Sequence, residues 1–157
     1  MGGSAPQSEG SSHGIRPAAT DGSESRSRRS ASVLVVDDDP ALRDTLCRML
    51  ESIGYRAESC ADARAAIDAI ERRRPDIVIS DVYMPVGDGF ELLNWIRRQA
   101  VDLPVVVISG SSSQSYDPLE LAERLGAAAV LDKPFRQSQL AETIDRVLAR
   151  RPPPPRA

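Results

Sequence analysis

Short apolar runs alternate along the middle of the chain with stretches whose apolar residues recur at helical spacing. Three of these runs contain only β-branched residues or leucine, which is typical of strands covered by helices on both faces. They are Val33 to Val36, Ile77 to Ile79 and Val105 to Ile108. Arg56 to Cys60 and Ala127 to Leu131 are weaker candidates, because the first is partly polar and the second is rich in alanine. We therefore expect three central strands, and the two weaker runs suit edge strands or strands packed closely by a helix.

Five helices are predicted between and after these strands. In the first, Asp39 is expected to be the N-cap, Pro40 the first helical residue and Gly54 the end;. Apolar spacing, caps and breaks mark the other four: Ala66, Ile67 and Ile70 ending before Pro75; Phe90, Leu93 and Ile96; Asp117, Pro118 and Glu120 ending at Gly126; and Leu140, Ile144, Val147 and Leu148;. The alternation of strands and helices predicts a doubly wound α/β fold with a five-stranded parallel sheet.

The chain length of 157 residues suits one domain, because two domains of half this size would each have a small core;. Residues 1–31 are rich in Ser, Gly, Pro and Arg, and we expect them to be a disordered tail;. Residues 151–157 include Pro152 to Pro155, which cannot be helical, and are expected to be a proline-rich tail;. The predicted domain spans residues 32–150.

Composition narrows the possible partners and compartment. The formal net charge of -3 lacks the basic excess that binding to a phosphate backbone requires, so nucleic acid is not an expected partner;. No apolar stretch approaches the roughly 20 residues that cross a bilayer, so no membrane association is expected. Cys47 and Cys60 are too few for a disulfide framework, and a reducing cytoplasm is the expected location;.

Polar side chains follow four of the predicted strands. Asp37, Asp38 and Asp39 follow the first, Asp81 the third, Ser109 the fourth and Lys133 the fifth. They should meet at one edge of the sheet, where parallel strands place their carboxyl ends. Carboxylates that converge repel one another and are usually stabilised by a hard divalent cation with oxygen ligands, for which Mg²⁺ is the natural candidate. A carboxylate beside such an ion can attack phosphorus while a nearby ammonium group, here Lys133, neutralises the incoming charge.

Four sequence segments together resemble the signatures of one family. VLVVDDDP, ISDVYMPVGDG, VVVISG and LDKPF are similar, in order and separation, to those of receiver domains in two-component response regulators. Any one segment alone would be a weak signal, but four together are specific. The resemblance covers about residues 32–150 and implies the flavodoxin-like strand order 2-1-3-4-5. It also implies a phosphorylation switch rather than an enzyme with a separate substrate.

The resemblance assigns roles to residues of the acidic site. It implies that Asp81 is the phosphoacceptor and that Asp38 binds Mg²⁺ directly. Asp37 would be a ligand that acts largely through water, and the backbone carbonyl of Tyr83 would complete the protein ligands. Asp39 is better explained as a helix cap than as a third metal ligand, because it directly precedes Pro40;. Asp88 and Gly89 are expected to form a turn.

Further roles implied by the resemblance concern the switch. The hydroxyl of Ser109 would turn toward the phosphoryl group, Lys133 would pair with it, and the Lys133–Pro134 bond would be cis. Position 130 is often aromatic in the family, but here it is Val130, so we expect the loop after Ser109 to transmit the change.

The resemblance also implies partners. The phosphoryl donor would be a histidine kinase or a histidine phosphotransfer protein. Only the proline-rich tail follows the fifth helix, so we expect a stand-alone receiver that signals to a downstream protein. The expected contact surface combines the fourth helix, the fifth strand and the fifth helix. A monomer or a weak homodimer is expected.

Two other functions fit part of the pattern. In a haloacid-dehalogenase-type phosphatase, Asp37 would be the nucleophile and Asp39 the acid;. Against this, residue 41 is Ala where Thr or Val is usual, no acidic pair follows Lys133 near a strand end, and no cap domain is expected. The other alternative is a receiver-like interaction module that is not phosphorylated, for which Val130 is the main argument.

Overall fold

The computed structural model describes residues 30–82, 84, 89–99, 102–110, 120, 123–124 and 126–151. In this part of the chain, five parallel strands form one sheet in the order β2-β1-β3-β4-β5. The strands are β1 (Ser32–Val36), β2 (Arg56–Cys60), β3 (Ile77–Asp81), β4 (Val105–Gly110) and β5 (Ala129–Lys133). The predicted doubly wound fold and strand order are confirmed, with β2 and β5 at the edges.

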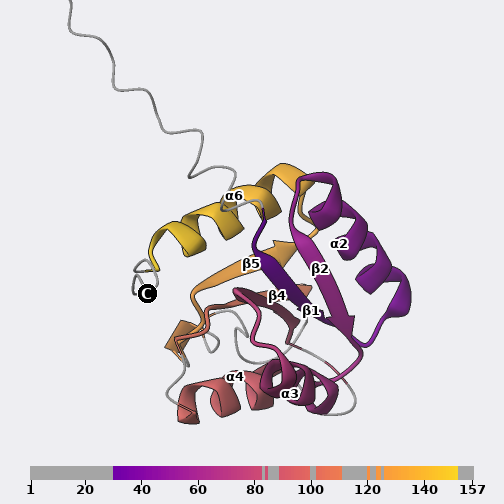
Figure 1. The fold of residues 1–157 in the computed structure, drawn as a ribbon. Coiled ribbons are helices and arrows are strands. Elements are labelled where there is room, and N and C mark those ends of the chain that lie inside the picture. The colour runs from indigo at the N-terminus through magenta and orange to yellow at the C-terminus, as the bar shows by residue number, and fades with distance from the viewer. Residues whose placement is uncertain are drawn as a thin grey trace, which may run out of the picture.

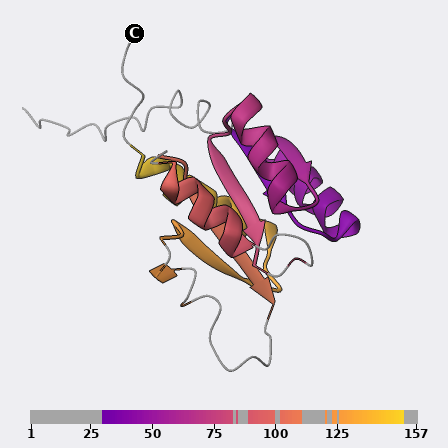
Figure 2. The ribbon, with the colours of Figure 1, turned by 90° about the horizontal axis from the view of Figure 1, so that it is seen from below.

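Helices cover both faces of the sheet. On one face lie α2 (Pro40–Ser52) and α6 (Gln137–Ala149), and on the other lie α3 (Ala63–Arg72) and α4 (Gly89–Arg98) (Figure 1). Figure 2, turned by 90°, brings α3 and α4 to the front. Because both faces are buried, the central strands contain continuous apolar runs instead of alternating apolar and polar residues.

Side chains of the central strands point alternately into two apolar layers. In β1, Leu34 and Val36 pack in the layer formed with α3 and α4. Val33 and Val35 pack in the layer formed with α2 and α6. This period of two is the ordinary geometry of an extended strand. It fixes the sheet between the helices and thereby fixes where the carboxyl ends of the strands emerge.

The first predicted helix has the expected ends. Asp39 is the N-cap, and its side chain accepts hydrogen bonds from the backbone N–H groups of Ala41 at 2.9 Å and Leu42 at 3.4 Å. Pro40 is the first helical residue. Gly54 follows the helix with φ of 99°, a conformation that favours glycine;. The capping role of Asp39 is therefore confirmed.

Two central strands extend beyond their apolar runs. We expected Asp81 and Ser109 to follow their strands, but Asp81 is the last residue of β3 and Ser109 lies within β4. Asp81 is still paired with Ile108 in the parallel ladder. The ladder needs only backbone groups, so it continues where the side chains become polar.

The predicted bounds of the fifth strand, residues 127–131, were wrong by two residues. Gly126 has φ of 90°, and Ala128 donates from its backbone N–H to the Val105 carbonyl at 2.8 Å, so pairing with β4 starts only here. Lys133 was expected after the strand, but it is the last residue of β5 and pairs with Gly110. The site lysine is thus held by the sheet itself.

Part of the predicted fourth helix lies outside the described residues. Its expected start at residues 117–118 is not described, whereas residues 120 and 123–124 are helical. Residues 1–29 and 152–157, which make up most of the two predicted tails, also lie outside. The domain boundaries therefore remain predictions.

Two further observations bear on the expected environment of the chain. Among the described helices, none combines the length and the apolar character needed to span a membrane. Cys47 and Cys60 are free thiols that pack in different apolar layers of the domain. A bond between these two cysteines is therefore not a feature of this fold.

Candidate functional site

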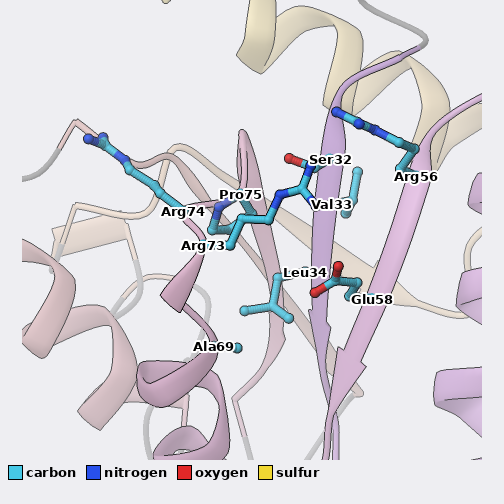
Figure 3. Close-up of a pocket in the computed structure, with 9 residues that line it drawn as sticks. All are labelled: Ser32, Val33, Leu34, Arg56, Glu58, Ala69, Arg73, Arg74 and Pro75. Atoms are coloured by element: carbon cyan, nitrogen blue, oxygen red, sulfur yellow. The ribbon is translucent and has the colours of Figure 1, made fainter. Parts of the chain in front are cut away.

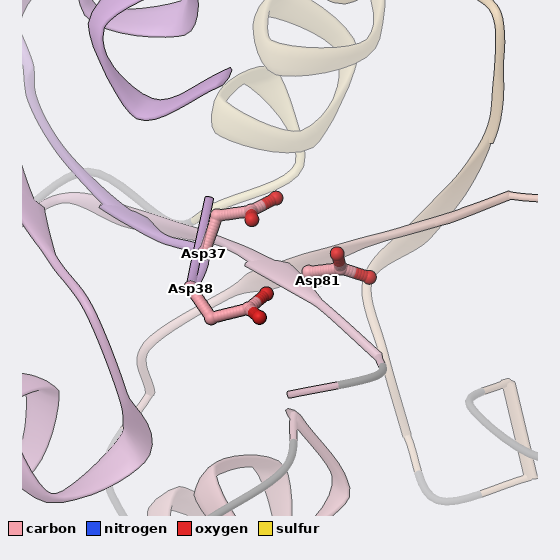
Figure 4. A group of neighbouring side chains, drawn as sticks. All are labelled: Asp37, Asp38 and Asp81. Carbon is pink, nitrogen blue, oxygen red and sulfur yellow. The ribbon is translucent and has the colours of Figure 1, made fainter. Parts of the chain in front are cut away.

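Three carboxylates meet at the carboxyl edge of the sheet (Figure 4). Asp37 and Asp38 directly follow β1, and Asp81 ends β3, the strand hydrogen-bonded to β1. One oxygen of each side chain lies within 4.8 Å of the others. Asp37 is 1% exposed and Asp81 is 8% exposed, whereas Asp38 is open to solvent. The structure therefore brings together the three side chains that the sequence indicated.

Lys133 reaches two of these carboxylates from the edge strand β5. Its Nζ lies 3.1 Å from Oδ2 of Asp81 and 3.6 Å from Oδ2 of Asp37. The side chain of Lys133 is 27% exposed, so water screens the pairs only in part;. The ammonium group offsets one of the three negative charges, which leaves the acidic cluster with a net attraction for a cation.

One oxygen of Asp37 is buried without a hydrogen bond. Its Oδ1 accepts from the backbone N–H of Asp39 at 2.9 Å, whereas its Oδ2 has no hydrogen-bond partner. Leaving such an atom unsatisfied costs free energy, and native structures rarely do so without a reason. A carboxylate with an oxygen within 4.8 Å of two further carboxylates is a suitable ligand for a hard divalent cation;. The residues present therefore fit a Mg²⁺ site.

The environment of Asp37 opposes its ionisation in the metal-free protein. Burial raises the pKa of this carboxyl above its usual value, and the negative charge of Asp81 acts in the same direction. The hydrogen bond from Asp39 and the charge of Lys133 lower the pKa of Asp37 but do not outweigh the first two effects. In the metal-free protein, ionised Asp37 is therefore less favourable in the folded state than in the unfolded chain;.

We expect Asp37→Asn to make the metal-free protein more stable at neutral pH. The folded state binds the Asp37 proton more tightly than the unfolded state does. Stability therefore falls as the pH rises from the ordinary pKa of the carboxyl to its raised pKa in the folded state;. Asparagine removes the charge and keeps the shape, and the melting temperature should rise by roughly 4 °C. Scanning calorimetry in a chelator measures this, and the difference should shrink as the pH falls toward the ordinary carboxyl pKa of about 4, because Asp37 then takes up its proton;.

The control for this prediction is Asp132→Asn. Asp132 is exposed on β5 beside Lys133, so the same chemical change there should leave the melting temperature nearly unchanged;. A melting temperature of Asp37→Asn at or below that of the wild type at neutral pH would show that ionised Asp37 carries no penalty.

The structure also describes three positions of the predicted switch, namely Ser109, Val130 and the Lys133–Pro134 bond. Ser109 is 1% exposed, and its hydroxyl donates to the carbonyl of Gly110 at 3.1 Å. The Lys133–Pro134 bond is cis, as expected. Val130 is partly buried against the apolar layer of α3 and α4. Tyr83 and Asp88 lie outside the described residues, as does the loop of residues 111–116.

Two residues of the site were missed or underrated in the sequence. Arg43, in the first turn of α2, donates from Nη1 to the backbone carbonyl of Asp37 at 2.7 Å. Gly89, expected only in a turn, packs so closely on β3 that an added Cβ would overlap the carbonyl oxygen of Asp81. A glycine at a helix start, eight positions after the candidate acceptor, was the available signal for the second.

A separate pocket lies near the amino-terminal end of β1 (Figure 3). Its lining residues are Ser32, Val33, Leu34, Arg56, Glu58, Ala69, Arg73, Arg74 and Pro75. None of them belongs to the acidic cluster, which lies at the carboxyl ends of the strands. In doubly wound sheets the ligands bind at those carboxyl ends. The pocket is therefore not part of the candidate site.

The fold and the site together define a class of signalling domain, because a doubly wound sheet carries an acidic cluster, a hydroxyl and a lysine at one edge. Residues 33–145 match the family model described as the response regulator receiver domain. The chain belongs to this family. Receiver domains are phosphoacceptor signalling domains that interact with histidine kinases and downstream effectors.

Among its relatives is the response regulator MprA of Mycolicibacterium vanbaalenii, which is 41% identical over 121 residues. The match covers 77% of this chain and 52% of MprA. The C4-dicarboxylate transport transcriptional regulatory protein DctD of Pseudomonas aeruginosa is 39% identical over 117 residues, or 74% of this chain and 25% of DctD. This chain therefore spans about half the length of MprA and a quarter of DctD.

Solved structures agree with the fold. The receiver domain of NtrX from Brucella abortus is 34% identical with a TM-score of 0.70, covering 76% of this chain and 99% of that one. The chemotaxis protein CheY4 of Vibrio cholerae is 33% identical with a TM-score of 0.68, covering 75% and 98%. The described strands and helices are thus arranged as in these receiver domains.

Proposed function

We propose that Asp81 accepts a phosphoryl group from a phosphohistidine donor, either a histidine kinase or a histidine phosphotransfer protein. The observation that carries the proposal is the position of the Asp81 carboxylate. Asp81 lies 3.1 Å from the ammonium of Lys133 and beside two further carboxylates. This arrangement combines a nucleophile with a fixed positive charge and a set of ligands for a cation.

In the proposed site, Mg²⁺ would be held by Asp37, Asp38 and Asp81. The backbone carbonyl of Tyr83, outside the described residues, is a further proposed ligand. The buried oxygen of Asp37 that has no hydrogen bond, and only the longer ion pair with Lys133, supports this assignment. When bound, the ion supplies positive charge next to the oxygens of the phosphoryl group.

The reaction follows from the groups at the edge of the sheet. A carboxylate oxygen of Asp81 attacks phosphorus, the phosphorus–nitrogen bond of the donor histidine breaks, and the imidazole leaves. The product is a mixed anhydride on Asp81. Lys133 is close enough to pair with the new negative charge, and its place at the end of β5 holds it there;.

The proposed signal passes from Ser109 to a partner-binding face. The Ser109 hydroxyl would leave the Gly110 carbonyl and donate to the phosphoryl group, which moves the loop after β4;. We propose that the face containing β5 and α6 then contacts a target protein. Nucleic acid is not a proposed partner, because the formal net charge is -3;. The proposed compartment is the cytoplasm, where cysteines such as Cys47 and Cys60 stay reduced;.

The phosphatase alternative loses its acid in this geometry. The side chain of Asp39 accepts hydrogen bonds from the first turn of α2, so it serves as the cap of that helix. It is not among the carboxylates that meet at the edge of the sheet. Asp37 would then lack the partner that protonates a leaving group.

The test is incubation of the chain with acetyl phosphate and Mg²⁺. We expect a mass increase of one phosphoryl group, placed on Asp81 by peptide mass spectrometry after borohydride reduction. Removal of Mg²⁺ with a chelator should slow labelling by at least about 100-fold. Label on Asp37 would instead support the phosphatase, and no label from acetyl phosphate or any phosphohistidine donor would support a module that is not phosphorylated.

A further inference from the structure

We propose that Arg43 is a positioning residue of the metal site, holding the turn after β1 so that the carboxylates of Asp37 and Asp38 face Asp81. This inference rests on the proposed function, because it concerns the same site. Arg43 is not itself a candidate ligand. Its guanidinium donates a hydrogen bond to the backbone carbonyl of the ligand residue Asp37.

The contact lies where the sheet stops supporting the chain. Pairing of β1 with β2 ends at Val36 and Cys60, and the last ladder bond runs from the Asp37 N–H to the Cys60 carbonyl at 3.2 Å. The Asp37 carbonyl is the first backbone acceptor after the end of β1. It accepts the bond from Arg43 at 2.7 Å, a length typical of hydrogen bonds from charged donors;.

The same arginine is fixed at its backbone. The Arg43 N–H donates to the Asp39 carbonyl at 3.0 Å in the first helical turn, and the Asp39 N–H donates to Oδ1 of Asp37 at 2.9 Å. Asp38 lies between Asp37 and Asp39 in the sequence. The Asp37 carbonyl belongs to the planar peptide that leads into Asp38, so holding this oxygen sets the direction in which Asp38 leaves the turn.

Loss of the hydrogen bond from Arg43 changes the Mg²⁺ affinity in a direction that depends on the role of this residue. A guanidinium near the site repels a cation, so electrostatics alone predicts that loss of the Arg43 charge strengthens Mg²⁺ binding. A positioning role predicts the opposite, because the two ligands of the turn lose their fixed orientation. The direction of the change in Mg²⁺ affinity therefore separates the two effects.

The experiment is calorimetric titration of Mg²⁺ into the full unphosphorylated chain. Arg43→Met and Arg43→Leu, whose side chains carry no hydrogen-bond donor, should both weaken Mg²⁺ binding by about tenfold. Arg43→Lys keeps a charged donor and should recover at least half of the lost binding free energy. Using two bond-breaking variants keeps the test decisive if one of them folds poorly by circular dichroism.

The matched control is Arg48→Met, which removes the same charge from an exposed position of α2 and should change the Mg²⁺ dissociation constant by less than about twofold;. Dissociation constants of Arg43→Met and Arg43→Leu equal to or below the wild-type value would overturn the inference. Because no phosphoryl donor is present, this result is independent of the proposed function, which fails separately if the wild type is not labelled on Asp81.

Discussion

Asp81→Asn is expected to abolish phosphorylation of the chain by acetyl phosphate and by a phosphohistidine donor. Asparagine has nearly the same shape, and its amide oxygen can still accept from Lys133, but it does not act as a nucleophile toward phosphorus;. Labelling should fall at least about 1000-fold. Intact-protein mass spectrometry over a time course measures the rate, and circular dichroism establishes that the variant is folded.

The comparison for this variant is again Asp132→Asn, which alters an exposed carboxylate next to Lys133 on β5. It should be labelled at the wild-type rate. If Asp81→Asn were labelled as fast as the control, the acceptor would be another residue. Label transferred to Asp37 in the variant would show that the cluster can use a neighbouring carboxylate as nucleophile.

The convergence of the acidic site followed from the sequence because it depends on one topological rule. Parallel strands place their carboxyl ends at one edge, so residues at the ends of β1, β3 and β5 were expected to approach one another. Asp37, Asp81 and Lys133 do so. The apolar runs also predicted the central strands, because burial on both faces leaves no other pattern.

The exact strand ends were beyond this reasoning. Hydrophobicity marks where side chains are buried, whereas a strand ends where its backbone hydrogen bonds end. Ser109 and Lys133 are polar and still lie on strands, because β4 and β5 keep pairing through Gly110. The pattern of apolar residues therefore ended both strands two residues too early, at Ile108 and Leu131 instead of Gly110 and Lys133.

Contacts made by docked helices were also beyond prediction. The bond from Arg43 to the Asp37 carbonyl depends on how the first turn of α2 faces the end of β1. The close approach of Gly89 depends on where α4 meets β3. Neither feature has a periodic signal, since each involves one residue whose neighbour is set by tertiary packing.

Gly89→Ala is expected to destabilise the domain strongly, although alanine normally favours a helix over glycine by about 1 kcal/mol. Its Cβ would overlap the Asp81 carbonyl oxygen and lie 3.0 Å from Oγ of Ser80. The Gly89 N–H donates to the Val82 carbonyl at 3.2 Å, so the helix start cannot shift without losing this bond. Relief of the overlap should cost about 2 to 3 kcal/mol.

A loss of this size should lower the melting temperature by roughly 8 °C or more, measured by scanning calorimetry. Labelling of Asp81 should slow as well, because its backbone has to move away from α4. Gly110→Ala is the matched control: a Cβ there would meet nothing within 4 Å, and stability should change by less than about 0.5 kcal/mol;. Equal melting temperatures for the two variants would show that α4 can retreat from β3 freely, and Gly89 would then have no special part in shaping the phosphoacceptor site.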